Sequence, residues 1–194
     1  MEETPQGMKK IVFIDRDGVI NRDPGGWTEH SYVEKWNDFH FLPGAKIAVK
    51  KLNDAGFDVI IVSNQAGVSR GFYTEEALND ITEKMVGEIE KAGGKIRKVY
   101  YCIHYNDDNC DCRKPKPGLF NRAERELGIV AGKSFFIGDG KMDVEAGSRK
   151  GLKTILVLSG KSRQKDVEGW SIKPDFIFAD LREAAEFIIS KGAR

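Results

Sequence analysis

The stretch "IVFIDRDGVIN", residues Ile11–Asn21, decides the fold class of this chain. Its apolar first half is typical of a buried strand. The strand ends by placing Asp15 and Asp17 two positions apart, with glycine directly after them. Aspartate and glycine also favour turns, and Arg16 could offset the charge, so an ordinary turn accounts for these residues when they are taken alone. The rest of the chain decides whether the paired carboxylates form a site.

Beyond this stretch, short β-rich runs alternate with longer segments of helical period. This alternation is typical of βαβ units and predicts an α/β fold, in which a mostly parallel sheet carries helices on both faces. We expect strands at Lys10–Ile14, Asp58–Val62, Lys98–Ile103, Ser134–Ile137, Lys153–Leu158 and Phe176–Phe178. We expect helices at Pro43–Ala55, Glu75–Ala92, Pro117–Leu127, Asp143–Lys150 and Leu181–Ser190.

Length and composition limit the function classes. At 194 residues, of which 40% are hydrophobic and 31% charged, the chain is expected to form one domain over residues 1–194. Lys and Arg number 31 against 30 Asp and Glu, a balance that argues against a nucleic-acid partner. No apolar stretch approaches the roughly 20 residues that span a bilayer, and the N-terminus lacks the apolar middle of a signal peptide. We therefore expect a cytoplasmic protein without a membrane partner; we also expect a monomer.

Ligands of such sheets collect at the carboxyl ends of the strands, so functional residues are expected directly after them. Four of the expected strands end in, or lead to, polar residues of particular kinds. In chain order these are Asp15 and Asp17, then Ser63, Asn64 and Gln65, then Arg113 and Lys114, and finally Asp139 and Asp143. Carboxylates, a hydroxyl group and a lysine on one sheet edge are typical of a site for Mg²⁺ and phosphate.

The paired carboxylates suit Mg²⁺, which usually engages one or two carboxylates together with phosphate oxygens. Asp15 and Asp139 are the expected ligands. Without a cation, carboxylates brought together raise the pKa of at least one of them and neutralise it. Asp15, kept ionised, is expected to attack phosphorus and form an aspartyl-phosphate intermediate. Asp17 is expected to protonate the leaving group and then deprotonate the hydrolytic water. The charge on the phosphoryl oxygens is expected to be stabilised by Ser63, Asn64 and Lys114.

The motifs DxDGV, SNQ, RKPKPG and GDxxxD occur in this order at strand ends, and the set resembles the haloacid dehalogenase (HAD) superfamily of aspartate-nucleophile phosphatases. The longer stretches "FIDRDGVIN", "FLPGA", "VSNQAGVSRGFYT", "YYCIH" and "CDCRKPKPG" resemble its branch of heptose bisphosphate and histidinol phosphate phosphatases. The resemblance extends from about Lys10 to Leu158 and implies a three-layer α/β/α, Rossmann-like fold. A chain of 194 residues leaves no room for a large cap domain over the site.

The resemblance also implies roles for individual residues. It gives Asp15 the role of nucleophile and Asp17 the role of acid/base. It also implies that Ser63 and Lys114 stabilise the phosphoryl group. The implied Mg²⁺ ligands are Asp15, the backbone carbonyl of Asp17, and Asp139.

Substrate contacts are implied for Arg113 and for the segment around Asp23. We also expect Asn64, Gln65 and Arg70 close to the substrate, although an ordinary surface arginine accounts for Arg70 as well. Two departures from the branch lie where specificity is set. Gly140 stands where heptose enzymes can carry a lysine, and the stretch Asp23–Phe39 is longer than the loop expected there.

The leading hypothesis is therefore a Mg²⁺-dependent phosphatase of a small phosphorylated sugar, which removes the C7 phosphate of a heptose bisphosphate. Within the same chemistry, the alternative substrate is histidinol phosphate or another small phosphate ester. A mutase or phosphotransferase could use the same intermediate. From a different class comes a non-catalytic zinc-bearing interaction module, against which the competent side chains at all four strand ends argue.

The three cysteines lie between Cys102 and Cys112, and internal disulfides cannot use up this odd count. These are Cys102, Cys110 and Cys112, and with His104 they spell CxHxxxxxCxC, four ligands that suit tetrahedral Zn²⁺ and leave no open position for catalysis. We expect a structural zinc loop over residues 102–112, which would fix where the two cations after it point. Members of the resembled branch also bind zinc with a CxH and CxC pair. A reduced, metal-free loop or a redox pair of Cys110 and Cys112 is the alternative.

Overall fold

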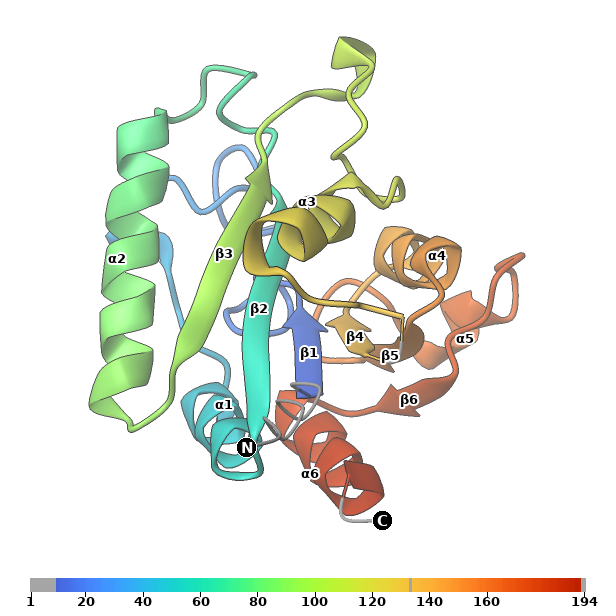
Figure 1. Cartoon of the computed structure of the whole chain (residues 1–194). Helices are drawn as coiled ribbons and strands as arrows, with labels where there is room; N and C mark the ends of the chain where they lie inside the picture. Colours follow the sequence, from blue (N-terminus) through green and yellow to red (C-terminus); the bar gives the residue numbers. More distant parts are fainter. Residues whose placement is uncertain (1–9, 133, 193–194) are drawn as a thin grey trace.

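A parallel sheet forms the centre of the molecule (Figure 1). The computed structural model describes residues 10–132 and 134–192. Within them the sheet has the order β3-β2-β1-β4-β5-β6 and every neighbouring pair is parallel. The strands are β1 (Lys10–Ile14), β2 (Phe57–Asn64), β3 (Ile96–Cys102), β4 (Phe135–Gly138), β5 (Lys153–Val157) and β6 (Phe176–Phe178). All predicted strands are present, β1 and β6 with the predicted bounds and the others within two residues of them.

The helices alternate with the strands as predicted. They are α1 (Ala45–Asp54), α2 (Glu75–Lys91), α3 (Gly118–Leu127), α4 (Lys141–Lys150), α5 (Gln164–Val167) and α6 (Leu181–Gly192), with short 3₁₀ turns at Trp36–Asp38 and Asn106–Asp108. Thr74 caps α2, since its Oγ1 accepts the Ala77 N–H at 3.2 Å. The four-residue helix α5 was not predicted, because so short a segment cannot show a helical period.

Helices cover both faces of the sheet, as Figure 1 shows. Side chains alternate along β1, so Val12 and Ile14 pack with α1, α2 and α6, whereas Ile11 and Phe13 pack with α3 and part of α4. All four side chains are buried, which explains why this strand is a continuous apolar run rather than an alternating one. The predicted three-layer α/β/α, Rossmann-like fold is confirmed.

The strand order reverses beside β1, because the chain continues to β2 and β3 on one side and returns to β4 on the other. The Asp15 N–H donates to the Ile137 carbonyl at 2.9 Å and extends the pairing of β1 with β4. This reversal opens a crevice at the carboxyl ends of the two strands. The residues after β1 and β4 therefore meet at the upper edge of the sheet in Figure 1.

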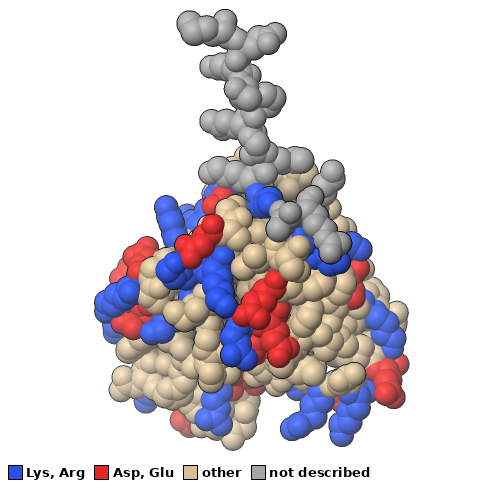
Figure 2. Space-filling view, turned by 90° about the horizontal axis from the view of Figure 1, so that it is seen from below, with Lys and Arg blue, Asp and Glu red and all other residues tan. Residues whose placement is uncertain are grey.

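The opposite edge, where the strands begin, faces the viewer in Figure 2. Lysine and arginine side chains are interspersed there with aspartate and glutamate, in keeping with a formal net charge of +1. Within the described ranges, none of the helices combines the length and the apolar character that crossing a lipid bilayer requires.

Candidate active site

Three buried carboxylates meet where β1 and β4 end. Oxygens of Asp15, Asp139 and Asp143 all lie within 4.8 Å of one another, and each residue is at most 8% exposed. The first two directly follow β1 and β4, and the third lies in the first turn of α4. Glycines permit this closeness, since a Cβ at Gly18 or Gly160 would lie 2.2 Å from Asp139 Oδ2. The glycine of the first motif therefore leaves room for the carboxylate of the fourth.

The electrostatics of this cluster favour a bound cation. Burial raises the pKa of Asp15 to about 6, although the charge of Lys114 lowers it. Burial also raises the pKa of Asp139 well above its ordinary value, and the charges of Asp143 and Asp15 raise it further. A divalent cation reverses these shifts because it favours the ionised carboxylates. The donors are hard carboxylate oxygens, and such a set fits Mg²⁺ better than a softer metal.

Lys114 is the cation already present between these carboxylates. Its ammonium group lies 2.8 Å from Asp15 Oδ2 and 2.6 Å from Asp143 Oδ1, and it donates to the Val62 carbonyl at 3.2 Å. Burial lowers the pKa of Lys114, but the two carboxylates outweigh burial and the net shift is upward, so the side chain stays charged. Asn64 anchors the backbone here, because its Oδ1 accepts the Lys114 N–H at 3.0 Å and its Nδ2 donates to the Lys114 carbonyl at 3.1 Å.

Asp17 belongs to a separate buried network. Arg16 donates to both of its carboxylate oxygens, with Nη2 at 3.0 Å from each, and Asn21 and Gln65 donate at 2.8 Å. Tyr73 completes the network by donating to Gln65 Oε1 at 2.8 Å. Burial by itself raises the pKa of Asp17. The Arg16 charge and these hydrogen bonds lower the pKa by more than burial raises it, so the net shift is downward. The free protein therefore holds this carboxylate ionised.

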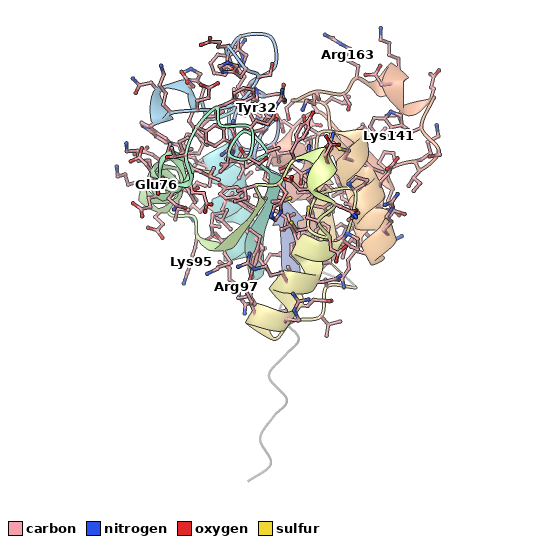
Figure 3. The ribbon with its side chains drawn as sticks, turned by 90° about the horizontal axis from the view of Figure 1, so that it is seen from above. Tyr32, Glu76, Lys95, Arg97, Lys141 and Arg163 are labelled. Atoms are coloured by element: carbon pink, nitrogen blue, oxygen red, sulfur yellow. The ribbon has the colours of Figure 1, made fainter. Side chains whose placement is uncertain are left out.

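A cavity of about 380 Å³ opens over the carboxylates, within the range of about 300–1,000 Å³ that is usual for small-molecule sites. Predicted site residues in its wall are Asp15, Asp17, Asp23, Ser63, Asn64, Lys114 and Asp139, together with Asp143. Figure 3 looks down on this edge and shows Lys141 and Arg163 on the side of α4 and α5, with Tyr32 toward the other side. The strand ends thus bring the predicted catalytic residues together.

Three predicted substrate contacts lie outside this cavity wall. Gln65 is 0% exposed, and its Nε2 donates to Asp17 Oδ2 at 2.8 Å and to Ser63 Oγ at 3.2 Å. Arg70 places its guanidinium 4.7 Å from the ring centre of Phe72 and 5.2 Å from that of Tyr105, so it joins two loops. Arg113 lines a neighbouring cavity of about 240 Å³ together with Lys116 and Arg149.

The four predicted zinc ligands are brought together. Ligand atoms of Cys102, His104, Cys110 and Cys112 lie within 4.8 Å of one another, and all three cysteines are free. Cys102 Sγ lies 3.7 Å from Cys110 Sγ and 3.7 Å from His104 Nδ1. Cys112 Sγ lies closer, 3.1 Å from Cys102 Sγ and 3.2 Å from His104 Nδ1. Tetrahedral zinc, with Zn–S bonds of about 2.3 Å and Zn–N bonds of about 2.0 Å, places such atoms roughly 3.5–3.8 Å apart, within several tenths of an ångström of these distances. The cluster is therefore compatible with a zinc site.

The cysteine loop also forms hydrogen bonds with the side chain of Arg113, which directly follows it. Arg113 donates from Nε to Asn106 Oδ1 at 2.7 Å and from Nη1 to the His104 carbonyl at 3.3 Å. Lys116 donates to the Cys110 carbonyl at 2.7 Å. The conformation of this loop consequently determines where Arg113 points.

Gly140, which the sequence analysis placed where specificity is set, also lies in the cavity wall. Other residues of the wall were not anticipated from the sequence: Lys141, Met142, Lys161, Ser162, Asp166 and Trp170. Several lie in the loop between β5 and α5 or in α5 itself. This loop follows a predicted strand, so the rule that ligands collect at the carboxyl ends of the strands, which gave the candidate catalytic residues, also covers Lys161 and Ser162. The position of this loop after a strand could have marked it as part of the site. It was missed because its sequence "SGKS" has no acidic residue that would indicate metal or acid/base chemistry.

Comparisons with known proteins show similarity to phosphatases, in keeping with the side chains of this site. The HAD-hydrolase-like family matches residues 111–184. The D-glycero-beta-D-manno-heptose-1,7-bisphosphate 7-phosphatase of Haemophilus ducreyi is 35% identical over 188 residues, which cover 93% of this chain and 98% of that protein. A D-glycero-alpha-D-manno-heptose-1,7-bisphosphate 7-phosphatase of Photorhabdus laumondii is 34% identical over 167 residues, 82% of this chain and 88% of that one.

Among solved structures, a phosphatase of the same kind has a similar fold. The crystal structure of D,D-heptose 1,7-bisphosphate phosphatase from B. bronchiseptica, complexed with magnesium and phosphate, superposes with a TM-score of 0.85 at 30% identity. The match covers 94% of this chain and 99% of that one.

Proposed function

Because this chain belongs to the HAD-like hydrolases, within the family of D-glycero-D-manno-heptose 1,7-bisphosphate 7-phosphatases, we propose that it hydrolyses the C7 phosphate of that heptose bisphosphate. The chain is a phosphoric monoester hydrolase. The observation that carries the substrate proposal is 35% identity to a heptose bisphosphatase across nearly the whole of both chains. The cavity at the strand ends, which holds the full set of phosphatase side chains, supports it.

In the proposed reaction Asp15 and Asp17 divide the chemistry. A carboxylate oxygen of Asp15 attacks the C7 phosphorus while the bond from phosphorus to the sugar oxygen breaks. The departing sugar oxygen takes a proton from Asp17. Asp17 then removes a proton from water, which attacks phosphorus, releases inorganic phosphate and restores Asp15. The separate surroundings of the two carboxylates fit these different roles.

The low pKa of Asp17 in the free protein suits its role as a base in the second step. For the first step Asp17 must carry a proton. The negative charge of a bound phosphate ester favours the protonated form, because a nearby like charge raises the pKa of a carboxyl group. Substrate binding therefore supplies the acid form that the leaving group needs.

Lys114 and Ser63 are proposed to hold the phosphoryl oxygens as charge develops on them. Mg²⁺ would be held by Asp15, the backbone carbonyl of Asp17, and Asp139; when bound, it would neutralise charge on the phosphoryl oxygens. Both carboxylate oxygens of Asp143 already have donors, Lys114 on Oδ1 and the Gly140 N–H on Oδ2 at 3.0 Å. This arrangement supports a role for Asp143 outside the metal's inner ligands.

Asp23 and Arg113 are the proposed contacts to the sugar end of the substrate. Asp23 lines the cavity, and two hydrogen bonds fix its conformation. The Gly25 N–H donates to Asp23 Oδ1 at 2.9 Å, and Trp27 Nε1 donates to the Asp23 backbone carbonyl at 2.6 Å. Within residues 10–132 and 134–192 no domain is inserted over the site. We propose that two loops close it instead, the segment Asp23–Asp38 after β1 and the cysteine loop.

The proposal predicts a substrate preference. With Mg²⁺, kcat/KM for D-glycero-D-manno-heptose 1,7-bisphosphate should exceed that for histidinol phosphate by at least about tenfold, a difference of roughly 1.4 kcal/mol in transition-state binding. One inorganic phosphate should appear for each bisphosphate consumed, and chelation of Mg²⁺ should abolish its release. A higher kcat/KM for histidinol phosphate would replace the proposed substrate, and transfer of phosphate to another hydroxyl without free phosphate would make the enzyme a phosphotransferase.

We further propose that the cluster of Cys102, His104, Cys110 and Cys112 holds a structural zinc ion. Purified protein should contain about one zinc per chain. Cys112→Ser should lower the zinc content and lower Tm by about 5 °C or more, because a structural zinc ion contributes directly to folding. The same variant should lose activity, since the loop positions Arg113.

Asp111→Asn is the matched control for this experiment, because Asp111 is an exposed residue between two of the ligands. It should retain zinc, Tm and activity. Zinc-free protein with full activity and an unchanged Tm would contradict a structural zinc ion.

A further inference from the structure

The loop after β5 lies directly against the catalytic carboxylates. Ser159 Oγ donates to the Gly18 carbonyl at 2.8 Å, and the Ser162 N–H donates to the Asp139 carbonyl at 3.2 Å. Between them, the Lys161 N–H donates to Asp139 Oδ2 at 2.7 Å. Gly160 allows this approach, since a Cβ there would lie 2.2 Å from the same oxygen. The backbone of Lys161 is therefore fixed relative to the reacting centre.

The side chain of Lys161 is presented to the catalytic cavity. It lines the cavity wall, its side chain is 68% exposed, and its ammonium lies 3.8 Å from Asp23 Oδ2. That distance is too long for a strong hydrogen bond, so the ammonium can donate to a ligand. Lys114 differs, because it is 2% exposed and its ammonium is held by Asp15 and Asp143.

A bisphosphate substrate needs a cation at its non-reacting end as well as at the reacting one. Gly140 supplies none. Lys141 lines the cavity too, and its ammonium lies 3.7 Å from Glu145 one turn along α4, so its ion pair is as long as that of Lys161. Arg113 is bound to the cysteine loop and lines the neighbouring cavity. Lys161 is distinguished by its backbone N–H, which binds Asp139 beside the reacting centre, and by its ammonium, which lies next to Asp23, the proposed contact to the sugar end of the substrate.

We propose that Lys161 determines substrate specificity by binding the non-reacting phosphate of the sugar bisphosphate, in place of a lysine at position 140. The inference rests on the proposed function. A dianionic phosphate competes with the single charge of Asp23 for the ammonium, so Asp23 orients the lysine and the substrate binds it. The contact is made in the ground state and in the transition state alike, and its loss acts mainly on KM.

The test compares two variants and two substrates. The readout is the ratio of kcat/KM for heptose 1,7-bisphosphate to that for heptose 7-phosphate, because only the first carries the second phosphate. Lys161→Met should lower this ratio about 10- to 100-fold, the value of one charge-assisted hydrogen bond, mainly through KM. Lys161→Arg should recover most of it. Lys141→Met is the matched control on the same wall and should keep the wild-type ratio.

The outcomes are distinct. An unchanged ratio in Lys161→Met, or an equal fall in Lys141→Met, overturns the assignment to Lys161. A wild-type enzyme that cleaves both heptose esters equally well also overturns it, because no contact to a second phosphate then exists. Cleavage of p-nitrophenyl phosphate but of neither heptose ester would instead refute the proposed function, and this inference with it. Every substitution keeps the N–H that binds Asp139, so the carboxylate cluster stays in place.

Discussion

Asp15→Asn is expected to abolish hydrolysis of every phosphate ester that the enzyme accepts, with kcat lower by at least about 10⁴-fold. The amide cannot attack phosphorus, and it lacks the charge that would help to hold Mg²⁺. Shape is largely preserved, because asparagine is nearly isosteric with aspartate. Its single amide oxygen keeps one of the two contacts of this side chain, which are the Arg16 N–H on Oδ1 at 2.7 Å and the Lys114 ammonium on Oδ2 at 2.8 Å. The loss should therefore appear in folded protein, measured as inorganic phosphate released over hours.

The same variant has a second expected effect, on stability without metal. Burial raises the pKa of Asp15 to about 6 from an ordinary value of 3.8, so the metal-free fold loses stability as the pH rises through this interval. Asparagine carries no such charge. In the presence of a chelator at pH 8, Tm of Asp15→Asn should equal or exceed that of the wild type.

Asp107→Asn, at an exposed aspartate, serves as the control and should change neither activity nor Tm. Turnover by Asp15→Asn at more than about a thousandth of the wild-type rate would mean that another group is the nucleophile. A large fall in its Tm would mean that the loss of activity reports unfolding instead.

The fold and the convergence of the candidate catalytic residues could be predicted from the sequence, because each depends on residue types at strand ends. A parallel sheet brings the carboxyl ends of its strands to one edge, so Asp15, Ser63, Lys114 and Asp139 converge although they are far apart in the chain. The zinc-type cluster was predictable for a related reason, since its four ligands lie within eleven residues.

What the sequence could not predict is the direction of individual side chains. Gln65 directly follows Asn64, yet it is fully buried and donates a hydrogen bond to Asp17 rather than lining the cavity. Arg70 lies in a motif rich in small and aromatic residues, and it stacks on Phe72 from its own loop and on Tyr105 from another. Such contacts depend on how loops from different strands fold over one another, which no local pattern encodes.

Asp17→Asn is the second variant with a large expected effect, a loss of about 10²- to 10⁴-fold for a sugar phosphate, because a sugar alkoxide is a poor leaving group unless it is protonated. The loss should be smaller when the first step is measured with p-nitrophenyl phosphate, whose leaving group departs as a stable anion. Rapid-quench measurement of the first turnover separates that step from hydrolysis of the intermediate. Equal losses of first-turnover rate for both esters would contradict the role of Asp17 as acid.

Asp17→Asn is also expected to lower stability, and this effect has to be separated from its effect on the reaction. Arg16 is fully buried, and Asp17 neutralises it from 3.0 Å. Removing one partner of a buried ion pair typically costs about 3–5 kcal/mol, whereas replacing both can be nearly neutral. The double variant Arg16→Met/Asp17→Asn should therefore recover Tm relative to Asp17→Asn without recovering activity. If the double variant regained turnover along with Tm, Asp17 would act by holding Arg16 in place rather than by moving protons.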